Sequence, residues 1–228
     1  MKIKTSILSL ILTFSLFSAF TAAQSEAKDQ KTKPEVPKLE KPATPAKPAR
    51  AKNEPLDFPE VDGWTKGDVQ KYPQAELGYS VNYDAKGSNR VTVYVYNGGR
   101  KDIRNSLAGA VKDEIEQAKS EIDAMAEMGV YSDVKVEKDE KTKVGGKAGK
   151  IDTLHKVLSF KARGNQLHSE IYIFPFEGNF VKIRATRPKA GGPADEEAVV
   201  RLLAEIEAMF VMYMDISDAT RTALIFRR

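Results

Sequence analysis

The pattern of apolar and polar positions changes near Phe58, and from there it predicts alternating strands and helices. Residues 79–84 and 90–96 alternate apolar and polar side chains, which is typical of strands with one buried face. The short Gly- and Asn-containing segment between them favours a hairpin. Residues 102–128 instead repeat apolar residues every three or four positions. They predict a long helix with Asp102 as its N-cap.

Four further strand patterns and a second long helix follow Gly129, the residue expected to end the first helix. The strand patterns lie around Val134 and Val136 and over residues 150–162, 167–174 and 180–186. A second helix is predicted from Pro193, with acidic residues in its first turn and an apolar stripe that reaches Phe210. Short turns between consecutive strands favour antiparallel pairing. The sequence therefore predicts an α+β fold: an antiparallel sheet of about six to seven strands packed with two main helices in an α/β/α sandwich.

The first 23 residues have the pattern of an export signal. Lys2 and Lys4 precede an apolar run over residues 7–20, and small residues follow up to Ala23. This order is typical of a secretory signal peptide, so we expect cleavage after Ala23 and a periplasmic or secreted protein. A retained membrane anchor is the weaker interpretation, because the apolar run is short.

Residues 24–56 contain six prolines among Lys, Ala and Glu and few large apolar side chains. Such a segment cannot bury enough apolar surface to fold, and its prolines favour extended backbone. It is predicted to be a disordered spacer, either a solvated leader or a tether whose lysines weakly contact an anionic envelope polymer or membrane surface. A single domain is expected over 57–211. The tail over 212–228 either docks on this domain or contacts a partner or a membrane.

The net charge of +4 is unevenly distributed along the chain. Residues 1–23 carry +2 and residues 24–56 carry +3, which leaves −1 for residues 57–228. A nucleic-acid-binding domain concentrates cationic side chains on its folded surface. We therefore expect no nucleic-acid partner.

The counts of cysteine and histidine narrow the chemistry further. The chain has no Cys and only two His, His155 and His168. These counts exclude disulfides, thiolate nucleophiles and any three-His metal site within one chain. A Ser-His triad would have to use one of the two histidines, and the chain has no Gly-x-Ser-x-Gly elbow.

Strand periodicity places aromatic and cationic side chains on the opposite side of their strands from the aliphatic ones. If the strands are neighbours, one sheet face would carry a candidate binding set: Tyr94, Tyr96, His168, Tyr172, Lys182 and Arg184. Aromatic surface with a few convergent polar groups suits a ligand or partner. The favoured alternative is that the C-terminal helix covers this face, so that the rings are core and the cations reach its edge.

Two other patterns resemble a phosphate-binding loop and a calcium site but do not fit either motif. Residues 145–150 (GGKAGK) have one residue too few between the flanking glycines for a phosphate-binding loop, and Ile151 stands where a hydroxyl residue is needed. The acidic residues between Asp133 and Glu140 alternate with lysines and lack a calcium-loop pattern. We read the first as a hairpin turn and the second as a solvated strand face, and we expect no metal and no cofactor.

The element order is similar to that of a known superfamily. Gly63-Trp64 and residues 77–83 (LGYSVNY), followed by a hairpin, a long helix, a meander and a terminal helix, resemble the PsbP-type α/β sandwich over roughly residues 58–210. The resemblance implies an antiparallel sheet with helices on both faces, often in exported accessory proteins. It favours a core position for Tyr94 and Tyr172. No residue matches a metal or partner site of that superfamily, so none is carried over.

These observations predict an exported, non-catalytic binding or accessory module of the cell envelope that recognises a protein or a small envelope ligand. The alternative is an extracytoplasmic hydrolase or transferase that uses His168 with a Ser or a carboxylate not identified from the sequence. A third hypothesis is a structural spacer whose function lies in the Lys- and Pro-rich segment.

Overall fold

The architecture is a single antiparallel sheet between two helices. The structure, a computed structural model, describes residues 54–86, 89–144 and 149–225. The elements are β1 (Thr65–Lys66), β2 (Gln70–Lys71), η1 (Ala75–Leu77), β3 (Tyr79–Ala85), β4 (Asn89–Tyr96), α1 (Ala110–Glu127), β5 (Tyr131–Val144), β6 (Ile151–Ala162), β7 (Asn165–Phe176), β8 (Asn179–Pro188) and α2 (Pro193–Ile225). They belong to one compact unit, Ala49–Arg228. The predicted signal segment and nearly all of the predicted spacer lie outside the described residues.

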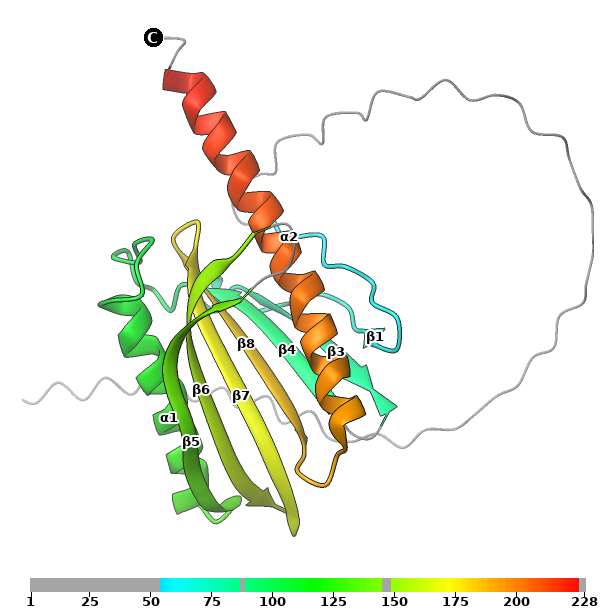
Figure 1. Cartoon of the computed structure of the whole chain (residues 1–228). Coiled ribbons are helices and arrows are strands. Elements are labelled where there is room, and N and C mark those ends of the chain that lie inside the picture. The colour runs from blue at the N-terminus through cyan, green and yellow to red at the C-terminus, as the bar shows by residue number, and fades with distance from the viewer. Residues whose placement is uncertain (1–53, 87–88, 145–148, 226–228) are drawn as a thin grey trace, which may run out of the picture. The chain divides into compact units, whose positions relative to one another are not determined.

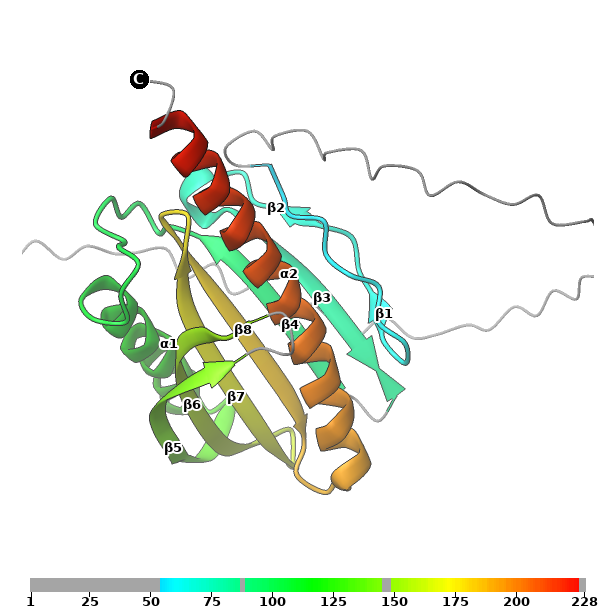
Figure 2. The same cartoon turned by 45° about the horizontal axis from the view of Figure 1, so that its top comes forward.

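The sheet has the strand order β1-β3-β4-β8-β7-β6-β5, with every neighbouring pair antiparallel and β2 also paired with β3 (Figures 1 and 2). The tight turns before β7 and β8 each place two residues at positive φ, at Arg163-Gly164 and Glu177-Gly178. Two consecutive residues of this kind match the twist of a hairpin. The predicted α+β class and antiparallel sheet are confirmed. β1 and β2 were not predicted, because two residues are too few to show an alternation.

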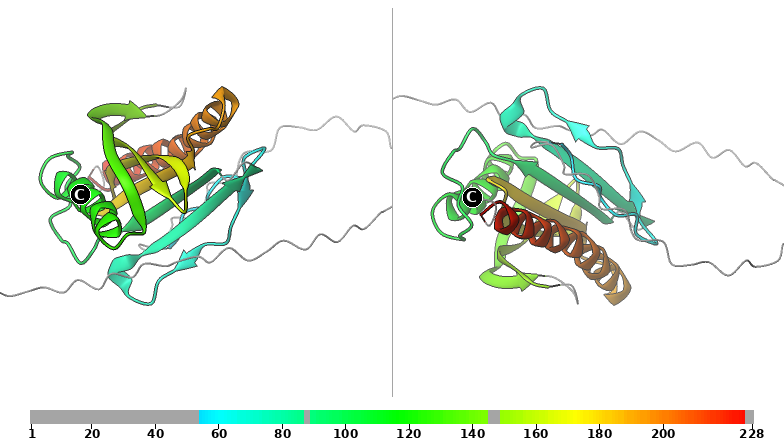
Figure 3. Two further views of the ribbon diagram at one scale, coloured as in Figure 1. Left: turned by 90° about the horizontal axis from the view of Figure 1, so that it is seen from below. Right: turned by 90° about the horizontal axis from the view of Figure 1, so that it is seen from above.

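Each helix buries one face of the sheet, as the end-on views of Figure 3 show. α2 packs over β3, β4 and β8 on one face, where Phe210 is fully buried and meets Phe58, Phe174 and Phe176 edge-on. α1 packs on the other face, where its apolar stripe buries Ile115 and Ile122. The aliphatic sets predicted from alternation thus form two separate cores on the two sides of one sheet.

α1 begins later than the sequence pattern predicts. The helix starts at Ala110 after Gly109, whose φ of 60° and ψ of −121° belong to a conformation that glycine adopts without strain. Asp102 lies well before the first helical residue and is therefore not the N-cap. Its carboxylate instead accepts hydrogen bonds from Arg100, at 2.9 Å from Nε and 2.7 Å from Nη2. Leu107 still packs against the α1-side core from a non-helical loop. The helical spacing of apolar residues over 103–107 therefore reflects contact with the core and not a helix. At the other end, Gly129 follows α1 with a φ of 73° and ends the helix as predicted.

β5 is a long edge strand with two irregularities. Its register against β6 shifts between Ser132 and Lys135 and again between Val136 and Lys138. Such bulges bend an edge strand, and Figure 1 shows β5 curving along the sheet beside α1. Its charged side chains and its bend both discourage pairing with another chain.

The limits of the folded unit differ from the predicted ones at both ends. Leu56, placed in the spacer by the sequence pattern, is only 2% exposed and packs in the α2-side core. Its backbone N–H donates to the hydroxyl of Tyr79 at 3.3 Å. At the other end α2 continues past residue 211 through Ile225, so most of the segment predicted as a tail is helical (Figure 1).

Candidate functional site

The six predicted binding residues lie on two opposite faces of the sheet. Directly opposed residues of an antiparallel pair share a face. β4 and β8 pair Tyr94 with Lys182, which places both on the α1 side, whereas β7 and β8 pair Tyr172 with Ile183 on the α2 side. The α1 side carries Tyr94, Tyr96, Lys182 and Arg184; the α2 side carries His168 and Tyr172. The prediction of one shared face is wrong, because alternation within a strand does not determine its register against the next strand.

The residues on the α1 side lie between the sheet and α1. The ammonium of Lys182 lies over the rings of Tyr94 and Tyr96, at 5.3 and 5.2 Å from their centroids. The Tyr96 hydroxyl donates a hydrogen bond to Glu114 of α1, and Lys182 lies 3.9 Å from Glu121 of the same helix. The rings and cations therefore tie α1 to the sheet. The covering helix is α1 and not the C-terminal helix that the sequence analysis favoured.

The burial of Tyr96 and Glu114 also shifts the pKa of both side chains. Burial, followed by the neighbouring carboxylate of Glu114, raises the pKa of Tyr96 well above its usual value. Burial raises the pKa of Glu114 as well, although the Tyr96 hydroxyl that donates to it acts in the opposite direction. Arg184 donates through Nε to the hydroxyl of Ser169 at 3.3 Å. Tyr96 and Lys182 thus link the sheet to α1, whereas Arg184 links β8 to β7.

A polar network on the α2 side surrounds Glu170. Its carboxylate accepts a hydrogen bond from the Tyr172 hydroxyl at 2.6 Å and lies 3.1 Å from Nε2 of His155 and 3.3 Å from Nε2 of His168. The His155 ring stacks on the Tyr172 ring, with centroids 4.2 Å apart. The candidate set from the sequence contained His168 and Tyr172 but not Glu170 or His155. The i, i+2 spacing of His168, Glu170 and Tyr172 was the available signal.

Glu170 is charged in the folded protein because its neighbours outweigh its burial. Burial acts against ionisation, but the hydrogen bonds from His155, His168 and Tyr172 together hold the pKa of Glu170 well below its usual value. Burial and then the charge of Glu170 raise the pKa of Tyr172. The other ring nitrogens of His155 and His168 lie 3.4 Å from Glu140 and 3.6 Å from Glu137. Each imidazole thus has a carboxylate near both of its ring nitrogens.

Glu170 should contribute stability that is lost in acid. A carboxyl group with a lowered folded-state pKa stabilises the fold above its unfolded-state pKa of about 4.3, and this contribution disappears as the pH falls toward the folded-state value. We expect Glu170→Gln to lower the free energy of unfolding by about 1–2 kcal/mol at pH 7 and to flatten its decline below about pH 5. Urea unfolding across this pH range measures both effects. Glu197→Gln, on an exposed part of α2, is the control; acid limbs of equal slope in wild type and Glu170→Gln would contradict the assignment.

The surroundings of His168 bear on the alternative of a hydrolase or transferase. Both ring nitrogens face carboxylates, those of Glu137 and Glu170. Ser159 lies opposite His168 in the β6–β7 register, is 3% exposed and hydrogen-bonds the Glu137 carboxylate through its hydroxyl. A nucleophilic serine needs its hydroxyl bound to the imidazole base and open to a substrate. Ser159 is not placed in that way.

Within residues 54–86, 89–144 and 149–225, no group of three or more His, Asp or Glu side chains is arranged to hold a metal ion. Over the same residues, no helix is both long enough and apolar enough to cross a membrane.

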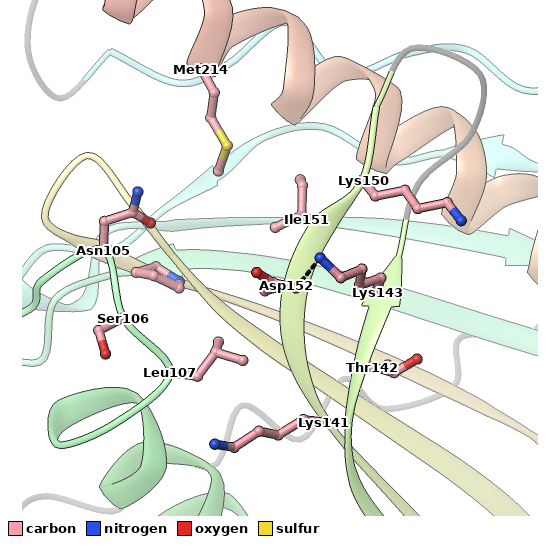
Figure 4. A pocket seen from close by; sticks show the side chains of 11 residues that line it. Asn105, Ser106, Leu107, Lys141, Thr142, Lys143, Lys150, Ile151, Asp152 and Met214 are labelled. Atoms are coloured by element: carbon pink, nitrogen blue, oxygen red, sulfur yellow. Dashed lines mark ion pairs between the residues drawn. The ribbon is translucent and has the colours of Figure 1, made fainter.

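A hollow of about 710 Å³ opens where the loop before α1, the β5–β6 end of the sheet and α2 meet (Figure 4). It is lined by Asn105, Ser106, Leu107, Lys141, Thr142, Lys143, Lys150, Ile151, Asp152, Pro175 and Met214. We call it the lysine hollow. Its volume falls in the range of about 300–1,000 Å³ that is typical of small-molecule sites. It includes none of the six residues selected from the sequence.

The lysine hollow combines an apolar interior with a cationic rim. Ile151 and Pro175 are buried at its base, and Leu107 and Met214 are half-buried. Figure 4 shows the side chain of Lys141 extending from β5 toward Leu107, while Lys143 reaches Asp152 at 2.9 Å. The lining carries three lysines and one aspartate, in a folded region whose net charge is −1. The hollow is therefore locally positive, although the folded region as a whole is slightly negative.

Comparisons with known proteins give little more than a distant structural likeness. No family model matches the chain, and no curated protein matches it. Among solved structures the chain is similar to LpqN, described as involved in cell envelope biogenesis of Mycobacterium tuberculosis. The sequence identity is 15% and the TM-score 0.35, over 65% of this chain and 79% of that chain.

Proposed function

We propose that this protein is an exported, non-catalytic binding module of the cell envelope and that the lysine hollow is its ligand site. The observation that carries the proposal is the hollow itself: an open concavity of about 710 Å³ with an apolar base and a few polar groups at its rim. Concavities of this kind are where small ligands bind in most proteins. Export is supported by the signal-like order of residues 1–23.

The remaining polar surfaces support a binding role less well. Of the residues selected from the sequence, Tyr96 and Lys182 contact α1, and Tyr94 lies under the Lys182 ammonium. The network around Glu170 is largely satisfied within the fold. A satisfied network stabilises a fold and has few free donors for a ligand. The element order also supports our proposal that the chain shares the PsbP-type sandwich, with α1 and α2 on opposite faces.

Site-specific photo-crosslinking in the host tests the proposed site. A benzophenone amino acid at Ser106, on the exposed rim of the hollow, should capture a small envelope ligand and add its mass to the protein. The same probe at Lys135, exposed on β5 and outside the hollow, is the matched control. Equal labelling at the two positions, or none at Ser106, would refute the hollow as the ligand site.

A further inference from the structure

Resting on the proposed function, which makes the lysine hollow the ligand site, we infer that its ligand is an amphipathic anion. The ligand combines an apolar body, which lies on Ile151 and Leu107, with a carboxylate or phosphate group that binds Lys141. The inference names the chemical class of ligand, and it follows from the base of the hollow, its cations and the loop that faces them.

The base of the hollow selects an apolar body. Ile151 is 6% exposed and continuous with the α2-side core, whereas Leu107 packs against the α1-side core. The hollow therefore lies at the end of the sheet where the two cores come close to solvent, with Met214 of α2 on its wall. An apolar group placed there removes its own surface and that of these side chains from water, which favours binding.

The cations select a negative head group. Within the described residues 54–86, 89–144 and 149–225, the ammonium group of Lys141 has no ion-pair or hydrogen-bond partner. Lys143 is paired with Asp152, but both side chains are more than 60% exposed, and exposed pairs of this kind contribute little to stability. Lys143 can therefore exchange Asp152 for a ligand anion at little cost. Because Lys141 and Lys143 are two positions apart on β5, their side chains leave the strand on the same face.

The loop before α1 supplies neutral hydrogen-bonding groups on the facing side of the hollow. The Ser106 hydroxyl oxygen accepts a hydrogen bond from the backbone of Ala108 at 3.2 Å, so its own proton is free to be donated. The side-chain amide of Asn105 is exposed at the same rim. Lys141, Ser106 and Asn105 thus offer donors around one opening. A charge-assisted hydrogen bond from Lys141 is the strongest of these interactions.

Calorimetric titration of the purified protein with octanoate, octyl phosphate, octanol and acetate tests the ligand class. We expect octanoate or octyl phosphate to bind about 10-fold more tightly than octanol, since a charge-assisted hydrogen bond corresponds to about that factor. Acetate, which lacks the apolar body, should bind more weakly still. Tighter binding of octyl phosphate than of octanoate identifies a phosphate head group, and the reverse order identifies a carboxylate.

Variants at the rim locate the head group. Lys141→Gln should lower the affinity for octanoate and octyl phosphate to that for octanol and leave octanol binding unchanged. Lys135→Gln, which removes an exposed lysine of the same strand outside the hollow, should change none of the affinities. Because Lys141 is exposed, its replacement should not affect folding.

Amide chemical shifts separate failure of this inference from failure of the proposed site. Equal affinities for octanoate and octanol, with shifts confined to residues 105–107 and 141–143, would overturn the anionic head group and leave the ligand site in place. Unchanged octanoate binding in Lys141→Gln would overturn the head group as well. Shifts from every probe that lie outside the hollow would overturn both.

Discussion

Phe210→Ala should lower the free energy of unfolding by about 3–5 kcal/mol, the usual cost of truncating a buried aromatic side chain. Phe210 is fully buried and meets three aromatic rings, those of Phe58, Phe174 and Phe176. It joins α2, the sheet and the segment before β1 at a single point. Its loss leaves a cavity and removes three edge-to-face contacts, each worth about 0.5–1.5 kcal/mol beyond the burial of its area.

Thermal and urea unfolding measure this effect. A fall in Tm of roughly 10 °C is expected for a domain of this size. Met212→Ala, two positions along the same helix but 47% exposed, should change the free energy of unfolding by less than about 0.5 kcal/mol. A similar loss in both variants would contradict the position of α2 on the sheet.

The pairing of Lys156 with two carboxylates leads to an asymmetric prediction. Lys156 is 3% exposed on the α1 side, and its ammonium lies 2.9 Å from Asp139 and 3.2 Å from Glu116 of α1. The two carboxylates are about half exposed. Removing both of them, in Glu116→Gln/Asp139→Asn, leaves a lysine without counter-charge in a position from which water is largely excluded. We expect a loss of about 2–3 kcal/mol in the free energy of unfolding.

Lys156→Met should cost less than about 1 kcal/mol, because the half-exposed carboxylates regain water and the methionine fills the apolar space. Urea unfolding of the two variants at neutral pH compares them directly. Each variant is the control for the other, since both remove the same ion pairs: one removes the carboxylates and the other removes the ammonium group. A larger loss in Lys156→Met than in the double variant would show that Lys156 is better solvated than its burial indicates.

The elements were predictable where periodicity was long and undisturbed. The strands after Gly129 and the helix from Pro193 lie close to their predicted positions, because turn residues bound the strands and Pro193 with an acidic first turn marks the start of the helix. The start of α1 was not predictable in this way. Leu107 follows the helical spacing but contacts the core from a loop, and the backbone of Gly109, not the apolar pattern, sets the first helical residue.

The candidate site was much less predictable than the fold. In β7 the residues from Ile171 to Phe176 are all buried, so both faces of this strand are covered and alternation no longer indicates which side is inside. Only the pairing of β7 with β8 places Tyr172 opposite Ile183 and separates it from Tyr94.

The lysine hollow depends even more on tertiary structure. It joins Ser106 to Lys141 and Met214, which are far apart in the sequence. Lysines at i, i+2 near the end of a strand are a weak signal, because they usually belong to a solvated face. The interpretation changes only when an apolar base and an opposing loop are seen beside them.

Native mass spectrometry of the protein taken directly from its host's envelope tests the central claim, that the lysine hollow holds a small ligand. The account predicts that the wild-type chain carries an additional bound mass. It also predicts that Leu107→Trp, which fills the hollow from its wall, has lost this mass while its circular dichroism spectrum is unchanged. A wild-type chain with no bound mass, or the same bound mass in Leu107→Trp, would contradict the account.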